Sequence, residues 1–400
     1  MSPAAEPTET VGSRSWLTRN LRVLSGVSLL QDAASEMLYP VLPIFLTVTL
    51  GAPASVVGFT EGLAEGIASV VKLFAGRFAD RRGRRSLIAA GYGLAAVGKL
   101  LIAVAFVWPV VLLGRGVDRV GKGIRGAPRD ALLMVDADPA ARGRIFGFHR
   151  AADTLGAVIG PAVGLAIYEA AGHRIRPLLI IAVVPAVASV GLVRWVADPG
   201  APAKAKTRTP IATPGSLPPA LRSLIVLLGL FSLVNFPDAL LLLRAHDLGL
   251  STAAVIGVYI VYNFVYAAAS YPAGAWSDKA PRHLVFALGL GFFAVGYLGL
   301  GLIHDSRWVW PILPLYGGFA ACTDGVGKAW VAELAPGGGQ GSAQGLLQAV
   351  TGAGVLVAGI VAGLAWRGDG RLPLLTAGTV GAALAVLLAV IGGRWRAVAP

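Results

Sequence analysis

The sequence predicts an all-α membrane protein with twelve transmembrane helices in two pseudo-symmetric six-helix bundles. Its 400 residues are 56% hydrophobic and only 14% charged, with a mean hydropathy of +0.71. Soluble proteins carry about 25% charged residues. Apolar runs of about 20 residues, the length that crosses a bilayer, recur along the whole chain. Three short motifs also recur in the same order in the two halves of the chain.

The first half holds a polar tail, residues 1–18, and the predicted first bundle, residues 19–197. Its fourth helix begins in the apolar run 103–114 and continues through the charged stretch 115–130. The apolar runs predict the other helices over residues 20–49, 54–75, 86–106, 145–168 and 177–196.

Residues 198–220 are rich in Pro, Ala and Lys and lack apolar periodicity, so we expect a linker there. The predicted second bundle covers residues 221–393, and residues 394–400 form a tail. Its helices are predicted over residues 221–243, 251–272, 284–303, 309–332, 342–365 and 372–392.

Lys and Arg gather in alternate loops, most densely in residues 76–85. This is the positive-inside pattern of membrane proteins, and it differs from the continuous basic surface that binds nucleic acid. We therefore expect no nucleic-acid partner, despite the net charge of +13. We expect a multi-pass protein of the inner (plasma) membrane with both termini in the cytoplasm and no cleaved signal peptide.

The fourth helix carries a stripe of charge. Arg115, Asp118, Arg119 and Lys122 fall within roughly a third of its circumference, at about 100° per residue. A charge at bilayer depth costs at least ~2.5 kcal/mol, so the stripe must face a protein interior or a watery cavity. The second half repeats the pattern at Asp324 and Lys328, which stand where Asp118 and Lys122 stand in the first half.

Four carboxyl groups lie in the first two predicted helices: Asp32, Glu36, Glu61 and Glu65. In a cavity of low dielectric such groups can load and release protons near neutral pH. They could equally bind an organic cation or a hard metal ion. The alternative is that they only neutralise the neighbouring cations. Asp32 is the strongest candidate for proton coupling, because it lies nearest the middle of its helix.

The basic residues leave two interpretations open. Arg115 and Arg119 could bind the carboxylate or phosphate of an anionic substrate, or they could pair with the acids in the membrane. The second half offers a softer lining that suits amphipathic organic solutes. Its candidate residues are Asn235, Asp238, Tyr259, Tyr262, Asn263 and Tyr266. Pro237 favours a kink beside Asp238.

The loop GRFADRRGRR resembles the loop signature of the major facilitator superfamily, G-x-[LF]-[AS]-D-R-x-G-R-[RK]. Its members here are Gly76, Phe78, Ala79, Asp80, Arg81, Gly83, Arg84 and Arg85. The second half has a degenerate copy with Gly274 and Asp278, in which Pro281 stands where the signature has glycine. The resemblance implies alternating access around a central site, with Asp80 and its arginines joining the bundles at the cytoplasmic side.

Two further resemblances bear on function. Arg115 resembles the helix 4 arginine that many proton-linked members use near the site, although the usual glycines do not follow it. The glycine pattern at Gly156, Gly160 and Pro161 resembles that of the drug/proton antiporter branches, except that Leu165 replaces the last glycine. It favours export. The motifs TEGLAEG and DRVGKGIRGAPRDAL resemble a bacterial permease subgroup without an assigned substrate, so they imply none.

We therefore predict a secondary active transporter that exports small organic compounds in exchange for protons. The alternatives are a transporter of metal ions or metal chelates, and proton-coupled uptake of an organic anion. The sequence has no metal-ligand spacing of His or Cys, no nucleophile elbow and no phosphate loop, so we expect neither an enzyme nor a resident metal. The proton gradient would supply the energy without a cofactor. The expected partners are a small solute and the lipid bilayer, and the resemblance implies a monomer.

Overall fold

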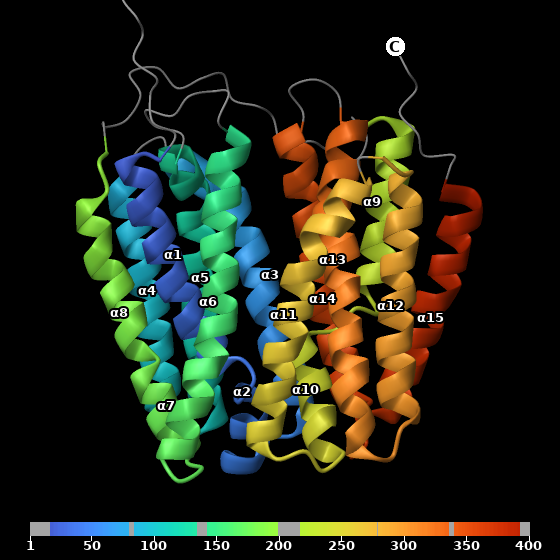
Figure 1. Ribbon diagram of the computed structural model, residues 1–400, viewed down its shortest axis with the longest axis horizontal. Helices are drawn as coiled ribbons and strands as arrows, with labels where there is room; N and C mark the ends of the chain where they lie inside the picture. The colour runs from blue at the N-terminus through green and yellow to red at the C-terminus, as the bar shows by residue number, and fades with distance from the viewer. Residues whose placement is uncertain are drawn as a thin grey trace, which may run out of the picture.

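The computed structural model describes residues 17–79, 84–133, 142–198, 217–277, 279–335 and 340–392, and these form helices without a strand (Figure 1). The first half contains α1 Arg19–Leu38, α2 Leu42–Ile44, the π-helical turn η1 Phe45–Thr49, α3 Ala54–Ala79, α4 Arg84–Ala103, α5 Trp108–Leu133, α6 Arg142–Ala170, α7 Ile175–Ile181, α8 Val183–Leu192 and the 3₁₀ turn η3 Val193–Trp195. The second half contains α9 Pro219–Ser232, α10 Asp238–Asp247, α11 Thr252–Ser277, α12 Arg282–Leu302, the 3₁₀ turn η5 Ser306–Trp308, α13 Val309–Leu334, α14 Gln340–Leu364 and α15 Arg371–Ile391.

Three of the predicted helices are interrupted. The predicted helix 20–49 ends at Leu38 and resumes as α2 and η1, because Pro40 and Pro43 lack the backbone N–H that a continuous helix needs. The predicted helix 177–196 divides between α7 and α8, just before Pro185. In the predicted helix 221–243 the expected kink at Pro237 is a full break between α9 and α10.

The helices form the expected twelve spans. Eight segments in the described ranges are long and apolar enough to cross a membrane. The other four spans are α1 with η1, α5, α9 with α10, and α13. Charged side chains lower the hydropathy of α1 and α5, and the break shortens α9. The sequence features that mark a candidate site therefore also weaken the hydropathy signal of its helices.

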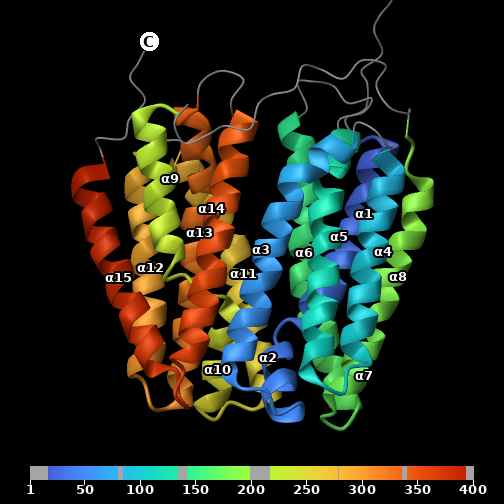
Figure 2. The same cartoon turned by 180° about the vertical axis from the view of Figure 1, so that it is seen from behind.

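Helices α1 to α8 lie side by side in one bundle and α9 to α15 in the other (Figures 1 and 2). Within the first bundle, α4 packs on α5 and α1 on α6; within the second, α12 packs on α15 and α11 on α13. The bundles meet where α3 packs on α14 and α6 on α11. Most of the predicted linker and both predicted tails lie outside the described residues.

Glycines bring the two bundles into close contact. A Cβ atom on Gly58 of α3 would stand 2.0 Å from the carbonyl oxygen of Gly359 in α14, and a Cβ on Gly359 would stand 2.4 Å from the oxygen of Gly58. Gly62 faces the backbone of Leu356 in the same way, with its nearest atom at 2.9 Å. Only glycine permits such an approach, as in other helix contacts of membrane proteins.

We expect Gly58→Val to separate α3 from α14, because the added side chain has no room against the Gly359 carbonyl group. A cysteine placed at Ser55, against which Gly363 packs, should then react faster with a membrane-impermeant maleimide than it does without the valine.

The matched control is Gly93→Val, since a Cβ on Gly93 meets nothing within 4 Å. It should leave the labelling rate of the cysteine at position 55 unchanged. Equal rates in the Gly58 variant and its control would show that this contact does not hold the bundles together.

Candidate functional site

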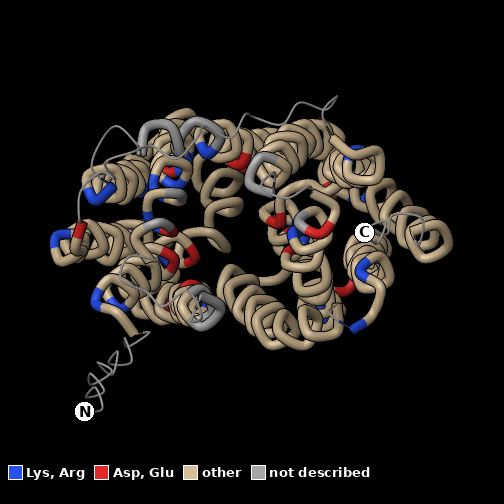
Figure 3. Tube along the Cα trace, turned by 90° about the horizontal axis from the view of Figure 1, so that it is seen from above, with Lys and Arg blue, Asp and Glu red and all other residues tan. Residues whose placement is uncertain are grey.

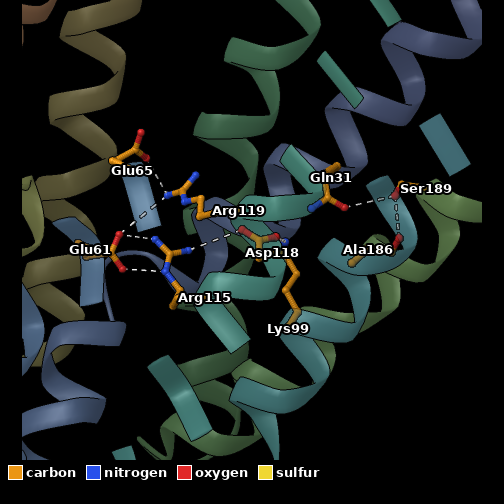
Figure 4. A network of polar contacts seen from close by, with 9 residues as sticks. All are labelled: Gln31, Glu61, Glu65, Lys99, Arg115, Asp118, Arg119, Ala186 and Ser189. Atoms are coloured by element: carbon orange, nitrogen blue, oxygen red, sulfur yellow. Dashed lines mark hydrogen bonds and ion pairs between the residues drawn. The ribbon is translucent and has the colours of Figure 1, made fainter. Parts of the chain in front are cut away.

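The centre of the first bundle holds a buried ion pair between Arg115 of α5 and Glu61 of α3 (Figure 4). The Arg115 Nε donates to Oε1 of Glu61 at 2.7 Å, and Nη2 donates to Oε2. The two side chains are 6% and 3% exposed. The two-pronged geometry is the one that best suits a guanidinium and a carboxylate. Each residue thus supplies the counter-charge that the other needs inside a bilayer.

Two more pairs extend this network (Figure 4). The Lys99 Nζ of α4 lies 2.8 Å from Oδ1 of Asp118, and both side chains are buried. Arg119 Nη2 lies 3.3 Å from Oε1 of Glu65 and 3.9 Å from Glu61. The network consists of three carboxylates, on Glu61, Glu65 and Asp118, and three cations, on Lys99, Arg115 and Arg119. Its charges balance, so these groups satisfy one another without a substrate.

Several other carboxyl groups have no such partner. Within the described residues, Asp32, Glu36 and Asp238 form no ion pair. Glu36 of α1 instead accepts a hydrogen bond of 2.5 Å from the Tyr259 hydroxyl of α11, which belongs to the other bundle.

Asp238 begins α10, directly after the break. It accepts hydrogen bonds from the hydroxyl groups of Tyr262 at 2.9 Å and Tyr316 at 2.8 Å. A carboxyl group surrounded by phenols rather than cations can exist with or without a proton, because its neighbours carry no fixed charge.

The tyrosines around these carboxyl groups form a continuous aromatic row, which we call the tyrosine row: Tyr39, Tyr259, Tyr262 and Tyr316. Successive ring centroids are 5.5, 5.7 and 5.8 Å apart. Tyr39 belongs to α1's C-terminal end and the other three belong to the second bundle. The row therefore crosses from one bundle to the other.

Asp32 faces a different neighbour. Its carboxyl group is half-buried and interacts with that of Asp153 in α6, while Lys122, Arg125 and Arg129 act on it electrostatically. The Arg125 guanidinium itself lies 4.4 Å from the centroid of the Tyr92 ring. Asp32 and Asp153 thus form a carboxyl pair on the two helices, α1 and α6, that pack against each other.

Polar side chains also line the faces on which the bundles meet. Arg150 of α6 donates to the Tyr266 hydroxyl at 3.3 Å, and this hydroxyl donates to Asp324 of α13 at 2.9 Å. Lys72 of α3 donates to Gln348 of α14 at 3.3 Å. Seen from above, many charged residues lie toward the middle of the molecule (Figure 3).

Several lysines are exposed although they lie within helices. Lys122 stands midway along α5, and Lys72 and Lys328 lie within α3 and α13. The positive charges of Lys122 and Lys328 both act electrostatically on Lys72. A lysine side chain in the middle of a membrane-spanning helix reaches water only where an opening in the protein admits solvent.

Other predicted site residues have local roles in the structure. Asn263 donates to the carbonyl oxygen of Tyr259 in its own helix. Asn235 lies in the break after α9. Gly156 and Gly160 do not lie between the bundles: they pack α6 on α1, and a Cβ on Gly160 would stand 2.4 Å from the oxygen of Ala33. Pro161 follows within α6.

The predicted gating loops are described only in part. Asp80, Arg81, Gly83 and Asp278 lie outside the described residues. The remaining members have positions in helices: Gly76 in α3, Arg84 at the start of α4, and Gly274 in α11.

Several residues that the prediction omitted belong to the site, among them Lys99, Tyr39, Asp153 and Tyr316. Tyr39 shares a helix face with Glu36, and Asp153 is a carboxyl group in a predicted span, so both carried a usable signal. Tyr316 carried none, because its contact with Asp238 joins residues far apart in the chain.

The metal hypothesis assumed that α1 and α3 place four carboxylates together. In the structure α1 packs chiefly on α6 and α8, whereas α3 packs on α5 and α14. Glu61 and Glu65 are engaged by arginines. In the parts of the chain that the structure describes, no three His, Cys, Asp or Glu side chains form a group that could hold a metal ion.

We expect Arg115→Gln to lower the free energy of unfolding by about 3–5 kcal/mol, because it leaves Glu61 buried and without its charge partner. The double variant Glu61→Gln with Arg115→Gln should recover most of this loss, since neither charge remains. Thermal unfolding of the purified protein in detergent measures both. A double variant as unstable as the single one would contradict the pairing.

Comparisons with known proteins agree with this architecture. The family model described as Major Facilitator Superfamily matches residues 24–244 and again 223–396. An uncharacterised MFS-type transporter of Methanocaldococcus jannaschii is 30% identical over 358 residues, which are 88% of this chain and 89% of that protein. Multidrug resistance protein MdtH of Cronobacter sakazakii is 25% identical over 288 residues, 70% of each chain.

Solved structures show the same fold at low identity. A bacterial homologue of the human lysosomal transporter Spinster, in an inward-facing and occupied conformation, matches with a TM-score of 0.76 and 15% identity, covering 97% of this chain and 100% of that one. The nucleoside transporter NupG matches with a TM-score of 0.75 and 14% identity, covering 93% and 98%. The protein belongs to the major facilitator superfamily and is a multi-pass membrane transporter, not an enzyme.

Proposed function

We propose that the protein exports small amphipathic organic compounds in exchange for protons, from an inner membrane in which both its termini face the cytoplasm. The observation that carries the proposal is the hydrogen bond between Glu36 and Tyr259. It places a carboxyl group without a cation partner within the tyrosine row, at the contact between the bundles.

The division of the acidic residues supports proton coupling. Glu61, Glu65 and Asp118 form ion pairs with cations, which stabilise the carboxylate form against uptake of a proton. Asp32, Glu36 and Asp238 form no ion pair, and a carboxylate without a paired cation in a medium of low dielectric is costly to keep charged. These three are therefore the groups in which we propose that protons are carried.

The tyrosine row supports an amphipathic organic substrate. Aromatic rings offer large apolar faces, which also attract organic cations. A cationic compound bound beside Glu36 would favour the charged carboxylate and so expel its proton. This competition couples the two movements in the sense of exchange. The similarity to multidrug resistance protein MdtH of Cronobacter sakazakii also supports export.

One observation favours a second candidate, proton-coupled uptake of an organic anion. Lys72, Lys122 and Lys328 are exposed, and Lys122 and Lys328 both repel Lys72. An anionic group bound among them would relieve that repulsion. Lys122→Gln should abolish movement of benzoate, a simple organic anion, if this candidate is correct, and should leave the transport of an organic cation intact if it is not.

The proposed exchange predicts that ethidium, a fluorescent amphipathic cation, dissipates an imposed pH gradient in inside-out vesicles that contain the protein. A pH-sensitive dye reads the gradient. Asp32→Asn should abolish the response, because an amide cannot carry a proton. Chloramphenicol, benzoate and divalent cations, added in turn, separate the substrate classes.

The control is Asp305→Asn, since the Asp305 side chain pairs with Arg307 two residues further along the chain and lies in the loop before α13. It should respond as the unchanged protein does. A full response in the Asp32 variant would remove Asp32 from the coupling mechanism. No response to any compound in the unchanged protein would count against exchange and favour the uptake candidate.

Glu36→Gln should also abolish the ethidium response, whereas Tyr259→Phe should retain it with a weaker apparent affinity. The first substitution removes the proton carrier, and the second removes only the hydroxyl that donates to it. Initial rates of dye recovery over a range of ethidium concentrations measure both effects. If the two variants lose the response equally, the hydrogen bond, not the protonation of Glu36, is what transport needs.

A further inference from the structure

A chain of buried polar groups leads away from the carboxyl pair of Asp32 and Asp153. Asp153 lies one turn beyond His149 on α6, and its Oδ1 is 3.9 Å from the His149 Nε2. This oxygen is buried and accepts no hydrogen bond from a described residue. His149 is itself buried, with its side chain 5% exposed. A titratable ring therefore stands next to a carboxyl oxygen whose hydrogen bonding is incomplete.

The ring of His149 contacts a hydroxyl group at each of its nitrogens. Nδ1 lies 3.3 Å from the hydroxyl oxygen of Ser25, and Nε2 lies 3.4 Å from that of Ser28, both on α1. The Ser28 hydroxyl also contacts the Tyr92 hydroxyl of α4 at 3.2 Å and accepts from Arg129 of α5 at 3.4 Å. Four helices thus meet at these groups.

The chain has a direction. The helices α1 and α6 both begin at the same end of the first bundle (Figure 1). Ser25 precedes Asp32 by two helical turns, about 10 Å along α1, on the side of that end. At the same end Arg129 pairs with Asp130, whose side chain is 49% exposed. The polar contacts therefore reach from the carboxyl pair, through Ser28 and Arg129, to the exposed carboxylate of Asp130.

We infer that His149 relays protons between the Asp32–Asp153 carboxyl pair and the aqueous phase at the end of the bundle where α1 and α6 begin. This inference rests on the proposed proton coupling and names the route by which its protons enter or leave.

The transfer balances with a ring that carries one proton before and after each step. The Asp153 carboxyl group gives its proton to the Ser28 hydroxyl, which passes its own proton to Nε2. The proton on Nδ1 passes to the Ser25 hydroxyl, which releases its own proton toward water. Asp153 is left as a carboxylate and the ring as the other tautomer. A proton that moves in the opposite direction restores the first tautomer. No oxidant or further reactant is required.

The charges around the ring suit a neutral relay. Arg129 and Arg150 act on the ring electrostatically as cations and Asp130 acts on it as an anion, while Asp153 lies one turn away on the same helix. A ring that stays neutral can pass a proton along without storing one, whereas the carboxyl pair stores it.

The test measures proton transfer directly, without a transported compound. The purified protein in lipid vesicles is subjected to a rapid drop in pH, and the infrared carboxyl band that is lost in Asp32→Asn and Asp153→Asn is followed in time. In His149→Gln this band should reach its normal amplitude but grow about a hundredfold more slowly, because an amide can hydrogen-bond with both serines without relaying a proton. His149→Asn should behave in the same way.

The matched control is His246→Gln in α10, whose ring contacts the carbonyl oxygen of Leu250. It should leave the rate unchanged. An unchanged rate in both His149 variants would overturn the relay. Loss of the band amplitude in both would also overturn it, since the ring would then only support the structure. If the unchanged protein gave no ethidium response but the carboxyl band still grew more slowly in the His149 variants, the result would count against the proposed function and not against the relay.

Discussion

The need to neutralise charge inside a bilayer determines how the first bundle is built. An arginine at the depth of Arg115 is tolerated only with a partner, and Glu61 provides it with two hydrogen bonds. The pair joins α3 to α5, and Lys99 with Asp118 joins α4 to α5 in the same manner. Because α3 also packs on α14 of the second bundle, the ion pairs hold the helix that carries the contact between the bundles.

This arrangement separates structural from functional acids. In the proposed mechanism, an acid that faces an arginine at 3.3 Å or less stays charged and does not carry the transported proton. The acids that face tyrosines or another carboxyl group remain free to change their charge. Glu36 and Asp238 face tyrosines, and Asp32 and Asp153 face each other. The acids that face tyrosines lie on helices of both bundles, α1 and α10, whereas the carboxyl pair lies within the first bundle.

The sequence predicts the membrane fold well because hydropathy is a local property. It locates every span and the break at Pro237, although it cannot tell a kink from a full break. It predicts less of the site. That Arg115 needs an acidic partner follows from the cost of burying its charge, but the choice of Glu61 over Asp32 depends on how α3 packs on α5. Tyr316 reaches Asp238 only through the folding of the second bundle, so no local pattern reveals it.

The central claim is that binding of an organic cation displaces a proton from a carboxyl group that lacks a cation partner. Calorimetric titration of the purified protein with ethidium, in buffers that differ in ionisation enthalpy, measures this displacement directly. The account predicts that ethidium binding releases a proton from the unchanged protein and that the release disappears when Asp32→Asn and Glu36→Gln are combined. Binding with no proton release in the unchanged protein, or with equal release in the double variant, would contradict it.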